Sequence, residues 1–330
     1  MNNVFEQLNG SDALLGPPTG DSPADAARRR VLGRLGQYAA LVVGPLNLRP
    51  TGATLLAQDE QRVEVRISTA GSHIVLVIAI EGDLAAEVFF LRALADRRLP
   101  IPRLIGHDLS RAVVPFSYAL ESYVGGVPLD RLADGPLMRV AARQLGRTLR
   151  RAHQTPAPGF GQPMAAGRWP GQGWVDTLRA WLAQREVLAR AVEVLGAEGA
   201  AAWQAATLEH PALAWDRPCV IHGAVAPDHA IVTVGDSAQL EALVRPGAIV
   251  GGDPLFDLAH GLLPRHPAAF RQGLLEGYTA SGALAPDQEG RLCRLRLLIW
   301  VADTLARADA PALARLPGAV AEALASLAPR

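Results

Sequence analysis

The sequence predicts an α+β protein with two lobes: an N-terminal antiparallel β-sheet lobe with one main helix, and a larger, mostly helical C-terminal lobe. Two β-like runs occupy the first quarter of the chain, whereas helical periodicity dominates beyond Asp130. A chain of 330 residues is long enough to bury a sizeable core in each lobe. We predict a flexible leader at 1–24, an N-terminal lobe at 25–122 and a C-terminal lobe at 123–330.

The elements of the first lobe follow from local pattern. Residues 1–24 are rich in Gly, Pro, Ser and Asn and lack periodicity, and Ser22 followed by Pro23 then begins a helix. Residues 62–69 alternate between polar and apolar, residues 73–80 are almost continuously apolar, and the short turn between them predicts a hairpin. Apolar residues then recur on one helical face over 83–99.

The second lobe is predicted from longer periodic segments. Residues 137–154 form an amphipathic helix, and residues 173–207 form one long or two shorter helices. Between them and the helical C-terminal third, two short apolar strands flank the sequence "HGAVAPDH" and form a small hairpin.

Composition excludes several classes of function. Apolar residues make up 49% and charged residues 19% of the chain, which indicates a globular protein. A net charge of +0 and a pI of about 7.1 give no electrostatic footprint for nucleic acid or an anionic membrane. No apolar run reaches the roughly 18 residues that span a bilayer. Neither a nucleic acid nor a membrane is therefore expected as a partner.

The cysteines and the N-terminus predict a cytoplasmic location. Cys219 and Cys293 lie far apart without metal-ligand spacing, as expected for thiols in a reducing compartment. The first 30 residues lack a positive segment followed by an apolar core, so we expect no signal peptide. No metal site is predicted.

The chain contains no lysine, so all 32 basic residues are arginines. Arginine stays charged at working pH and forms no Schiff base, which excludes mechanisms that need a lysine base or nucleophile. A GC-rich genome accounts for arginine at most surface positions, but not for the loss of a lysine that chemistry requires.

Several motifs in order resemble the aminoglycoside phosphotransferase and choline kinase-like family, which has a protein-kinase-like fold. The segment "VIHGAVAPDHAIV" (220–232) is similar to the family's catalytic loop, and "GDPLFDLA" (252–259) to its metal loop. Further similarity lies in "AAEVFFLRAL", "LPIPRLIG", "ALESYVGGVPL" and "LGRTLRRAHQTPAPGFG". The resemblance covers about residues 50–330 and implies the bilobal kinase-like fold.

The resemblance also implies that the chemical groups of a kinase are missing. In such kinases an aspartate orients the attacking hydroxyl, an asparagine and a second aspartate hold magnesium, and a β3 lysine grips the phosphates. The corresponding positions hold Ala224, His229, Arg245 and Val77, and Glu87 is left without its usual lysine partner. The phosphate-covering turn reads Ala57, Gln58, Asp59 and Glu60, with no glycine. ATP and Mg²⁺ are therefore not expected to bind productively.

Other site residues keep more than one interpretation. By resemblance, Asp257 and His222 are structural, and Asp257 bonds the backbone of the loop. If the site has been repurposed, His222, Asp228, His229 and Asp253 are the catalytic candidates, although adjacent residues on an extended segment face opposite ways. Arg245 either fills a vacated cation site beside Glu87 or Asp253, or binds an anionic ligand.

Four tryptophans lie in the region where the family builds its acceptor pocket. Trp169, Trp174 and Trp181 are candidates for ligand binding, although tryptophans at helical spacing, with Trp203 among them, usually belong to the core.

These observations lead to a primary hypothesis and two alternatives. The first is a catalytically degenerate pseudokinase that binds a protein, a peptide or a small molecule in its inter-lobe cleft, by analogy of fold in natural-product or ribosomal-peptide biosynthesis. The second is a repurposed enzyme, or a small-molecule binding or resistance protein, that uses the same cleft. An active kinase is the least favoured.

Overall fold

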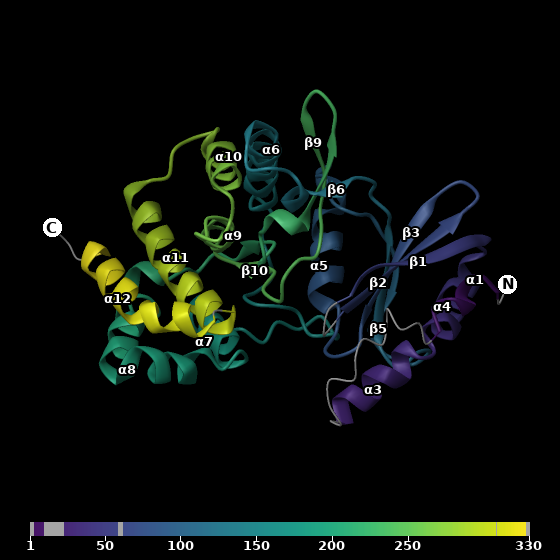
Figure 1. The fold of residues 1–330 in the computed structure, drawn as a ribbon, viewed down its shortest axis with the longest axis horizontal. Coiled ribbons are helices and arrows are strands. Elements are labelled where there is room, and N and C mark those ends of the chain that lie inside the picture. The colour runs from purple at the N-terminus through teal and green to yellow at the C-terminus, as the bar shows by residue number, and fades with distance from the viewer. Residues whose placement is uncertain (1–2, 10–22, 59–61, 308, 328–330) are drawn as a thin grey trace. The chain divides into compact units, whose positions relative to one another are not determined.

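The computed structural model describes residues 3–9, 23–58, 62–307 and 309–327. The chain divides into two compact units, which are described separately: residues 1–92 with 102–124, and residues 93–101 with 125–330. The first unit holds an antiparallel sheet and the second is mostly helical (Figure 1). The predicted α+β class is therefore confirmed.

The first unit is built on a five-stranded sheet in the order β1-β2-β3-β5-β4, and every neighbouring pair is antiparallel. Its strands are β1 (Pro50–Gln58), β2 (Arg62–Thr69), β3 (His73–Ala79), β4 (Leu104–Asp108) and β5 (Ser117–Ser122). The predicted hairpin of β2 and β3 is confirmed. Strand β1 was not predicted, because only Ala53 of its residues is buried and its sequence carries little apolar alternation.

Two apolar layers cover the faces of this sheet. On one face, inward residues of β2 such as Val63, Val65 and Ile67 pack with helix α4 (Leu35–Val43). On the other, Val77 and Ala119 pack with Val88 of helix α5 (Ala85–Leu94). Alternation along β2 therefore supplies one layer, whereas the continuously apolar β3 contributes to both, with Leu76 in the first layer and Val77 in the second.

The start of the chain does not match the predicted flexible leader. Helix α1 (Asn3–Glu6) places Phe5 and Leu8 in the core, each with 3% of its surface exposed. The side chain of Asn9 accepts a hydrogen bond from the backbone N–H of Gly36 at 2.8 Å. The prediction is thus wrong for residues 3–9, whose few apolar side chains are buried by tertiary contacts. Residues 10–22 lie outside the described part.

The predicted helix that begins at Ser22 and Pro23 is divided in the structure. Helix α3 (Pro23–Leu32) ends before Gly33, and α4 starts at Leu35. Glycine in a helix interior costs roughly 1 kcal/mol relative to alanine, so the break falls at the weakest position of the pattern.

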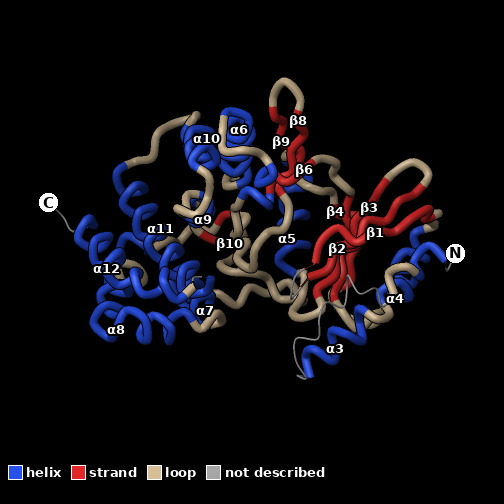
Figure 2. The backbone as a smooth tube through the Cα atoms, in the orientation of Figure 1, coloured by secondary structure: helices blue, strands red, loops and turns tan. Residues whose placement is uncertain are grey.

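In the described part of the second unit, seven helices carry the bulk, and short strands lie among them (Figure 2). The helices are α6 (Pro136–Ala152), α7 (Trp174–Ala183), α8 (Val187–Ala206), α9 (Leu255–Gly261), α10 (Ala268–Thr279), α11 (Pro286–Arg307) and α12 (Ala310–Leu327). The strands are β6 (Val127–Pro128), β7 (Cys219–Val220), β8 (Ala230–Val234), β9 (Ala238–Leu243) and β10 (Gly251–Gly252). Sheet β6-β8-β9 and the pair β10-β7 frame the segment that resembles a catalytic loop.

The segment predicted as one long or two shorter helices forms two, α7 and α8. Gly196 interrupts α8 with a φ of 76°, a conformation that glycine adopts without steric cost. Within the described ranges, we find no helix with the length and apolar content needed to cross a membrane.

Candidate functional site

The loop between β7 and β8 takes a tight path at Gly223. Its φ of 76° lies in the left-handed region, and a Cβ at this position would stand 2.0 Å from the carbonyl oxygen of Ile249. Only glycine fits, because any side chain would overlap backbone. The His222-Gly223 pair is therefore fixed by the approach of residues 248–250.

Asp257 of α9 holds this loop from beneath. Its buried carboxylate accepts hydrogen bonds from the backbone N–H groups of His222 and Gly223, both at 2.7 Å, and from Nε2 of His153 at 2.9 Å. Burial raises the pKa of Asp257, but the bonds and charge of His153 and His222 outweigh burial, so its pKa is lowered. The carboxylate therefore uses its hydrogen bonds to hold the loop in shape.

His153, at the end of α6, connects this anchor to α10. Its Nδ1 lies 3.0 Å from the hydroxyl of Tyr278, and its side chain is 4% exposed. One imidazole therefore bridges the loop anchor and a buried tyrosine.

The side chain of His222 has a structural partner. Its Nε2 donates a hydrogen bond to the carbonyl of Val244 at 2.9 Å, which ties the loop to the residue after β9. Burial lowers the pKa of His222 to about 4, so the ring is neutral at pH 7.

Asp228 and His229 lie closer together than an extended segment would place them. Residues 227–229 form a short 3-10 helix, and Nε2 of His229 stands 3.7 Å from Oδ2 of Asp228. Nδ1 of His229 donates to the carbonyl of Ala224 at 2.6 Å, and its ring lies 5.8 Å from that of His222. The expectation of opposite faces is wrong because the chain turns here.

Asp253 is not part of this group. It is fully buried, lies 2.8 Å from Nε of Arg291 on α11, and accepts the backbone N–H of Leu255 at the start of α9. Burial raises its pKa to about 6, against the opposing charge of Arg291. Arg291 therefore supplies a cation to Asp253, and the predicted contact of Arg245 with Glu87 or Asp253 stays a prediction.

Arg245 lies in the loop between β9 and β10. Its φ of 58° places a non-glycine residue in the left-handed region, a conformation that costs about 1 to 3 kcal/mol and marks a constrained loop. The structure does not test whether Arg245 binds an anion, so this interpretation stays a prediction.

The donors of the second unit do not fit a magnesium ion. Nδ1 of His229 is committed to a carbonyl, Asp253 is paired with Arg291, and Arg245 is itself a cation. Among the described residues, no three His, Cys, Asp or Glu side chains are grouped to hold a metal. Mg²⁺ prefers oxygen ligands in near-octahedral geometry, so we derive no step through it.

In the first unit, Glu87 of α5 has a cationic partner that the sequence analysis missed. Nη1 and Nη2 of Arg62 bind its two carboxylate oxygens at 2.6 and 2.7 Å, and Nε of Arg62 binds Glu64 at 2.7 Å. Val77 is buried in β3, paired in register with Glu64. Glu87 therefore lacks the lysine partner usual in kinases, as expected, but β2 supplies an arginine in its place.

Glu121 of β5 lies beside this pair and is 5% exposed. Burial, and then the negative charge of Glu87, raise its pKa well above the usual range. Residues 57–60 were predicted as a phosphate-covering turn; Ala57 and Gln58 end β1, and Asp59 and Glu60 lie outside the described residues.

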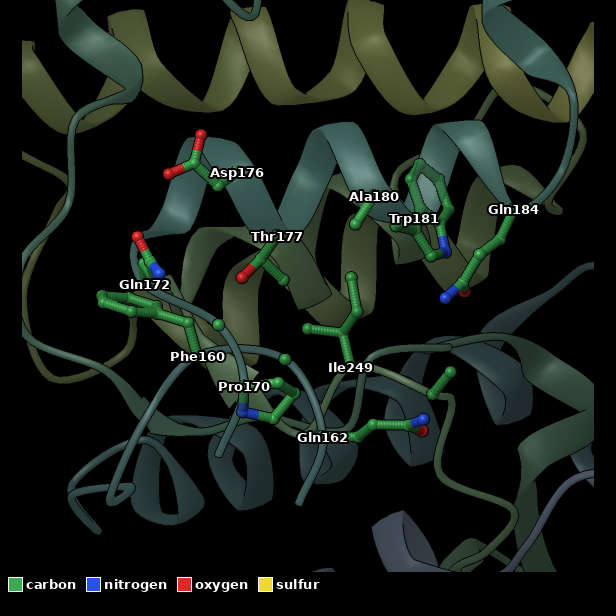
Figure 3. Close-up of a pocket in the computed structure, with 13 residues that line it drawn as sticks. Phe160, Gln162, Pro170, Gln172, Asp176, Thr177, Ala180, Trp181, Gln184 and Ile249 are labelled. Atoms are coloured by element: carbon green, nitrogen blue, oxygen red, sulfur yellow. The ribbon is translucent and has the colours of Figure 1, made fainter. Parts of the chain in front are cut away.

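A pocket of about 400 Å³ opens within the second unit, between α7, residues 160–172 and residues 248–249 (Figure 3). Phe160, Trp181 and Ile249 supply apolar surface, and Gln162 and Gln184 supply carboxamides. Ile249 also contacts Gly223 through its carbonyl oxygen, so pocket and loop share a residue.

Of the tryptophans predicted to bind a ligand, Trp181 lines this pocket. Trp174 is a core residue, 1% exposed, with its ring 5.4 Å from that of Phe256. Trp169 is half-buried and packs over Gly159 and Gly251. The prediction of a binding role is therefore wrong for Trp174, whose ring has no open face for a ligand.

Comparison with known proteins shows which family model matches this chain and which solved structures are similar to it. Residues 53–292 match the model of a family described as phosphotransferase enzymes. No curated protein sequence matches the chain. A thermostable mutant of aminoglycoside phosphotransferase APH(4)-Ia, in ternary complex with ADP and hygromycin B, is similar in structure, with a TM-score of 0.66 and 17% identity over 90% of this chain and 100% of that chain.

Two further solved structures are similar. Macrolide 2'-phosphotransferase MphH from Brachybacterium faecium gives a TM-score of 0.55 at 19% identity, over 88% of this chain and 99% of that chain. A putative fructosamine-3-kinase from Haemophilus somnus 129PT gives 0.57 at 15% identity, over 87% and 96%. At such identities the likeness supports the fold, which is that of the kinase-like phosphotransferases.

Proposed function

Because this chain belongs to the phosphotransferase enzyme family, we propose that it is a catalytically degenerate member that works by binding a partner. The family supplies the fold, while the residues of this chain decide what the fold does.

One observation supports the proposal most directly: the loop keeps its backbone geometry but lacks the side chains that carry out phosphotransfer in this family. Asp257 still binds both backbone N–H groups of the His222-Gly223 pair. Ala224, at the position of the base, has no group that accepts a proton, and the carbonyl of Ala224 takes Nδ1 of His229. Loss of a general base alone costs roughly 10²- to 10⁴-fold in rate, before loss of metal ligands is counted.

The partner is a protein, a peptide or a small molecule. A small molecule fits the pocket beside the loop, and the APH(4)-Ia relative is a complex with ADP and hygromycin B. A role in natural-product or ribosomal-peptide biosynthesis rests on analogy of fold. The two free thiols, Cys219 and Cys293, suit a reducing cytoplasm.

A thermal-shift titration with ATP, with and without Mg²⁺, tests the proposal. A ligand at 100 times its Kd stabilises the native state by about 2.7 kcal/mol, so productive Mg²⁺-ATP binding would raise the Tm visibly. We expect no magnesium-dependent rise. APH(4)-Ia is the positive control, and a magnesium-dependent shift accompanied by ADP release would overturn the proposal.

A second candidate is a repurposed enzyme, which the contact of Asp228 with His229 favours. A carboxylate beside an imidazole can orient it for proton transfer. Asp253 does not join this pair, since Arg291 holds it elsewhere. His229→Ala leaves partner binding intact in a binding protein, whereas it abolishes turnover in a repurposed enzyme.

A further inference from the structure

The pocket in the second unit combines an apolar floor with uncharged polar side chains. We propose that it binds an uncharged small molecule that has a flat apolar face and several amide or hydroxyl groups. This inference rests on the proposed binding function and names the chemical class of its ligand.

The floor of the pocket is preformed. Trp181 is 6% exposed, and its ring is held by Phe256 at 5.7 Å, by His260 at 6.0 Å and by the guanidinium of Arg185 at 4.6 Å. Ile249, 4% exposed, comes from the opposite side. Binding on this floor therefore costs little conformational entropy, because the side chains are already ordered, and it favours ligands with flat apolar groups.

Three carboxamides provide the polar groups: Gln162, Gln172 and Gln184. Each offers two N–H donors and an acceptor oxygen, and none of the three forms a hydrogen bond to another described residue. Figure 3 shows Gln162 and Gln184 at the edge of the space below α7. Such side chains match amides and hydroxyls, which also combine donors with acceptors.

The pocket directs almost no formal charge at a ligand. Asp176 is the one ionisable residue in its lining; its side chain is 66% exposed and lies 3.5 Å from Arg179. Its carboxylate points away from Gln162 and Ile249 in Figure 3. Arg185 stacks on Trp181 and does not line the space. A charged ligand would lose hydration without gaining a counter-ion.

The size of the pocket limits the ligand to a small molecule. A volume of about 400 Å³ lies within the range of about 300 to 1,000 Å³ usual for small-molecule sites. Thr177 adds no free donor, since its hydroxyl donates to the carbonyl of Gly173 at 2.9 Å. Recognition therefore depends on the floor and the carboxamides.

Three closely related phenylalanine derivatives that carry different net charges test the ligand class. N-acetylphenylalanine amide is neutral, phenylalanine amide is a cation and N-acetylphenylalanine is an anion. Saturation-transfer NMR titration of the full chain measures each Kd. We expect the neutral probe to bind about tenfold more tightly than either charged probe. Equal affinities, or no binding of the neutral probe, would overturn the inference.

A matched pair of variants locates the binding. Ala180 lines the pocket and is exposed, so Ala180→Trp fills the space without entering the core. Ala183 is an exposed residue of the same helix outside the lining, so Ala183→Trp is the control. Ala180→Trp should abolish binding of the neutral probe and Ala183→Trp should preserve it. Undiminished binding to Ala180→Trp would place the probe elsewhere and refute the assignment.

The outcomes separate this inference from the proposed function. Magnesium-dependent binding of ATP would refute the degenerate role while leaving the probe results unchanged. Tight binding of a charged probe would refute the ligand class while leaving the binding role in place.

Discussion

A single guanidinium organises the acidic cluster of the first unit. Arg62 bonds Glu87 and Glu64, and the buried Glu121 lies beside them. Burial lowers the pKa of Arg62, but the charges of Glu87 and Glu64 outweigh burial and raise it. The arginine therefore stays charged, and the carboxylates depend on it.

Removing this guanidinium should destabilise the fold. We expect Arg62→Met to lower the free energy of unfolding by about 3 kcal/mol, because Glu87 is left charged and buried. Urea titration measures the loss, and Arg49→Met, at an exposed position, is the control. Adding Glu87→Gln should restore part of the loss. If Arg62→Met is as stable as Arg49→Met, the cluster does not need its cation.

The role of Arg62 was only half visible in the sequence. Alternation over 62–69 places Arg62 and Glu64 on the same face of a strand, but it does not reveal that Glu87 reaches them from a helix 25 residues away. Likewise, Asp253 and Arg291 are 38 positions apart in sequence, and only the fold brings them together. Local pattern predicts which residues share a face, whereas partners across elements depend on tertiary packing.

At the scale of the element, α9 and the loop that it anchors hold groups whose pKa values are shifted by burial and by their neighbours. Asp257 lies in the first turn of the helix and anchors the loop, and His260 follows one turn later with its pKa lowered to about 3 by burial. His222, bonded to Asp257 through its backbone, has its pKa lowered to about 4 by burial. Both rings are therefore neutral in the folded protein at pH 7.

Stability should consequently fall in mild acid. Unfolded histidine titrates near pH 6.5, so unfolding takes up protons between about pH 6.5 and 4 and the free energy of unfolding decreases as pH falls. Asp253, with its pKa raised to about 6 by burial, opposes this trend, since acid favours its folded form. His266, whose pKa burial also lowers to about 4, adds to the loss, and Glu121, whose pKa burial raises, opposes it like Asp253. Three histidines outweigh two carboxyls, and we expect a net loss of about 2 kcal/mol from about pH 7 to 5.

Urea titrations at several pH values check this dependence. His260→Asn should flatten the profile, and His73→Asn, at an exposed position of β3, should leave it unchanged. A profile that His260→Asn does not alter would show that protonation of this ring does not limit stability.

The elements themselves were predicted unevenly. The hairpin β2-β3, helix α5 and helix α6 carry strong periodicity and are confirmed. Strand β1 and helix α1 were missed because each owes its place to contacts with other elements. Periodicity thus identifies elements that bury a continuous face and fails for edges and short helices.

At the scale of the whole molecule, the proposed loss of phosphotransfer is spread over both units. Val77 belongs to the first unit, whereas Ala224, His229 and Arg245 belong to the second. The resemblance to a family identified these positions, and no physical pattern in the chain alone would have singled out Val77 among the apolar residues of β3.

A single restoration should therefore not recover activity. Ala224→Asp supplies a carboxylate at the position of the base. His229 and Arg245 still do not suit the binding of magnesium, and Val77 still does not suit the binding of phosphate. We expect no ATP hydrolysis above background, and no shift of Tm with Mg²⁺-ATP, for Ala224→Asp. The matched comparison is the triple variant that adds His229→Asn and Arg245→Asp. Turnover by the single variant would mean that the other positions are compensated.

The anchoring of the loop by Asp257 bears on how sequences of this kind are interpreted. Its carboxylate oxygens accept two backbone N–H groups and one imidazole, and all three contacts lie within the protein. The motif "GDPLFDLA" therefore encodes the curvature of a loop and can persist in a chain irrespective of turnover. As a diagnostic signature, it identifies an architecture, and assigning an enzyme activity from it requires the residues at positions such as 224, 229 and 245 as well.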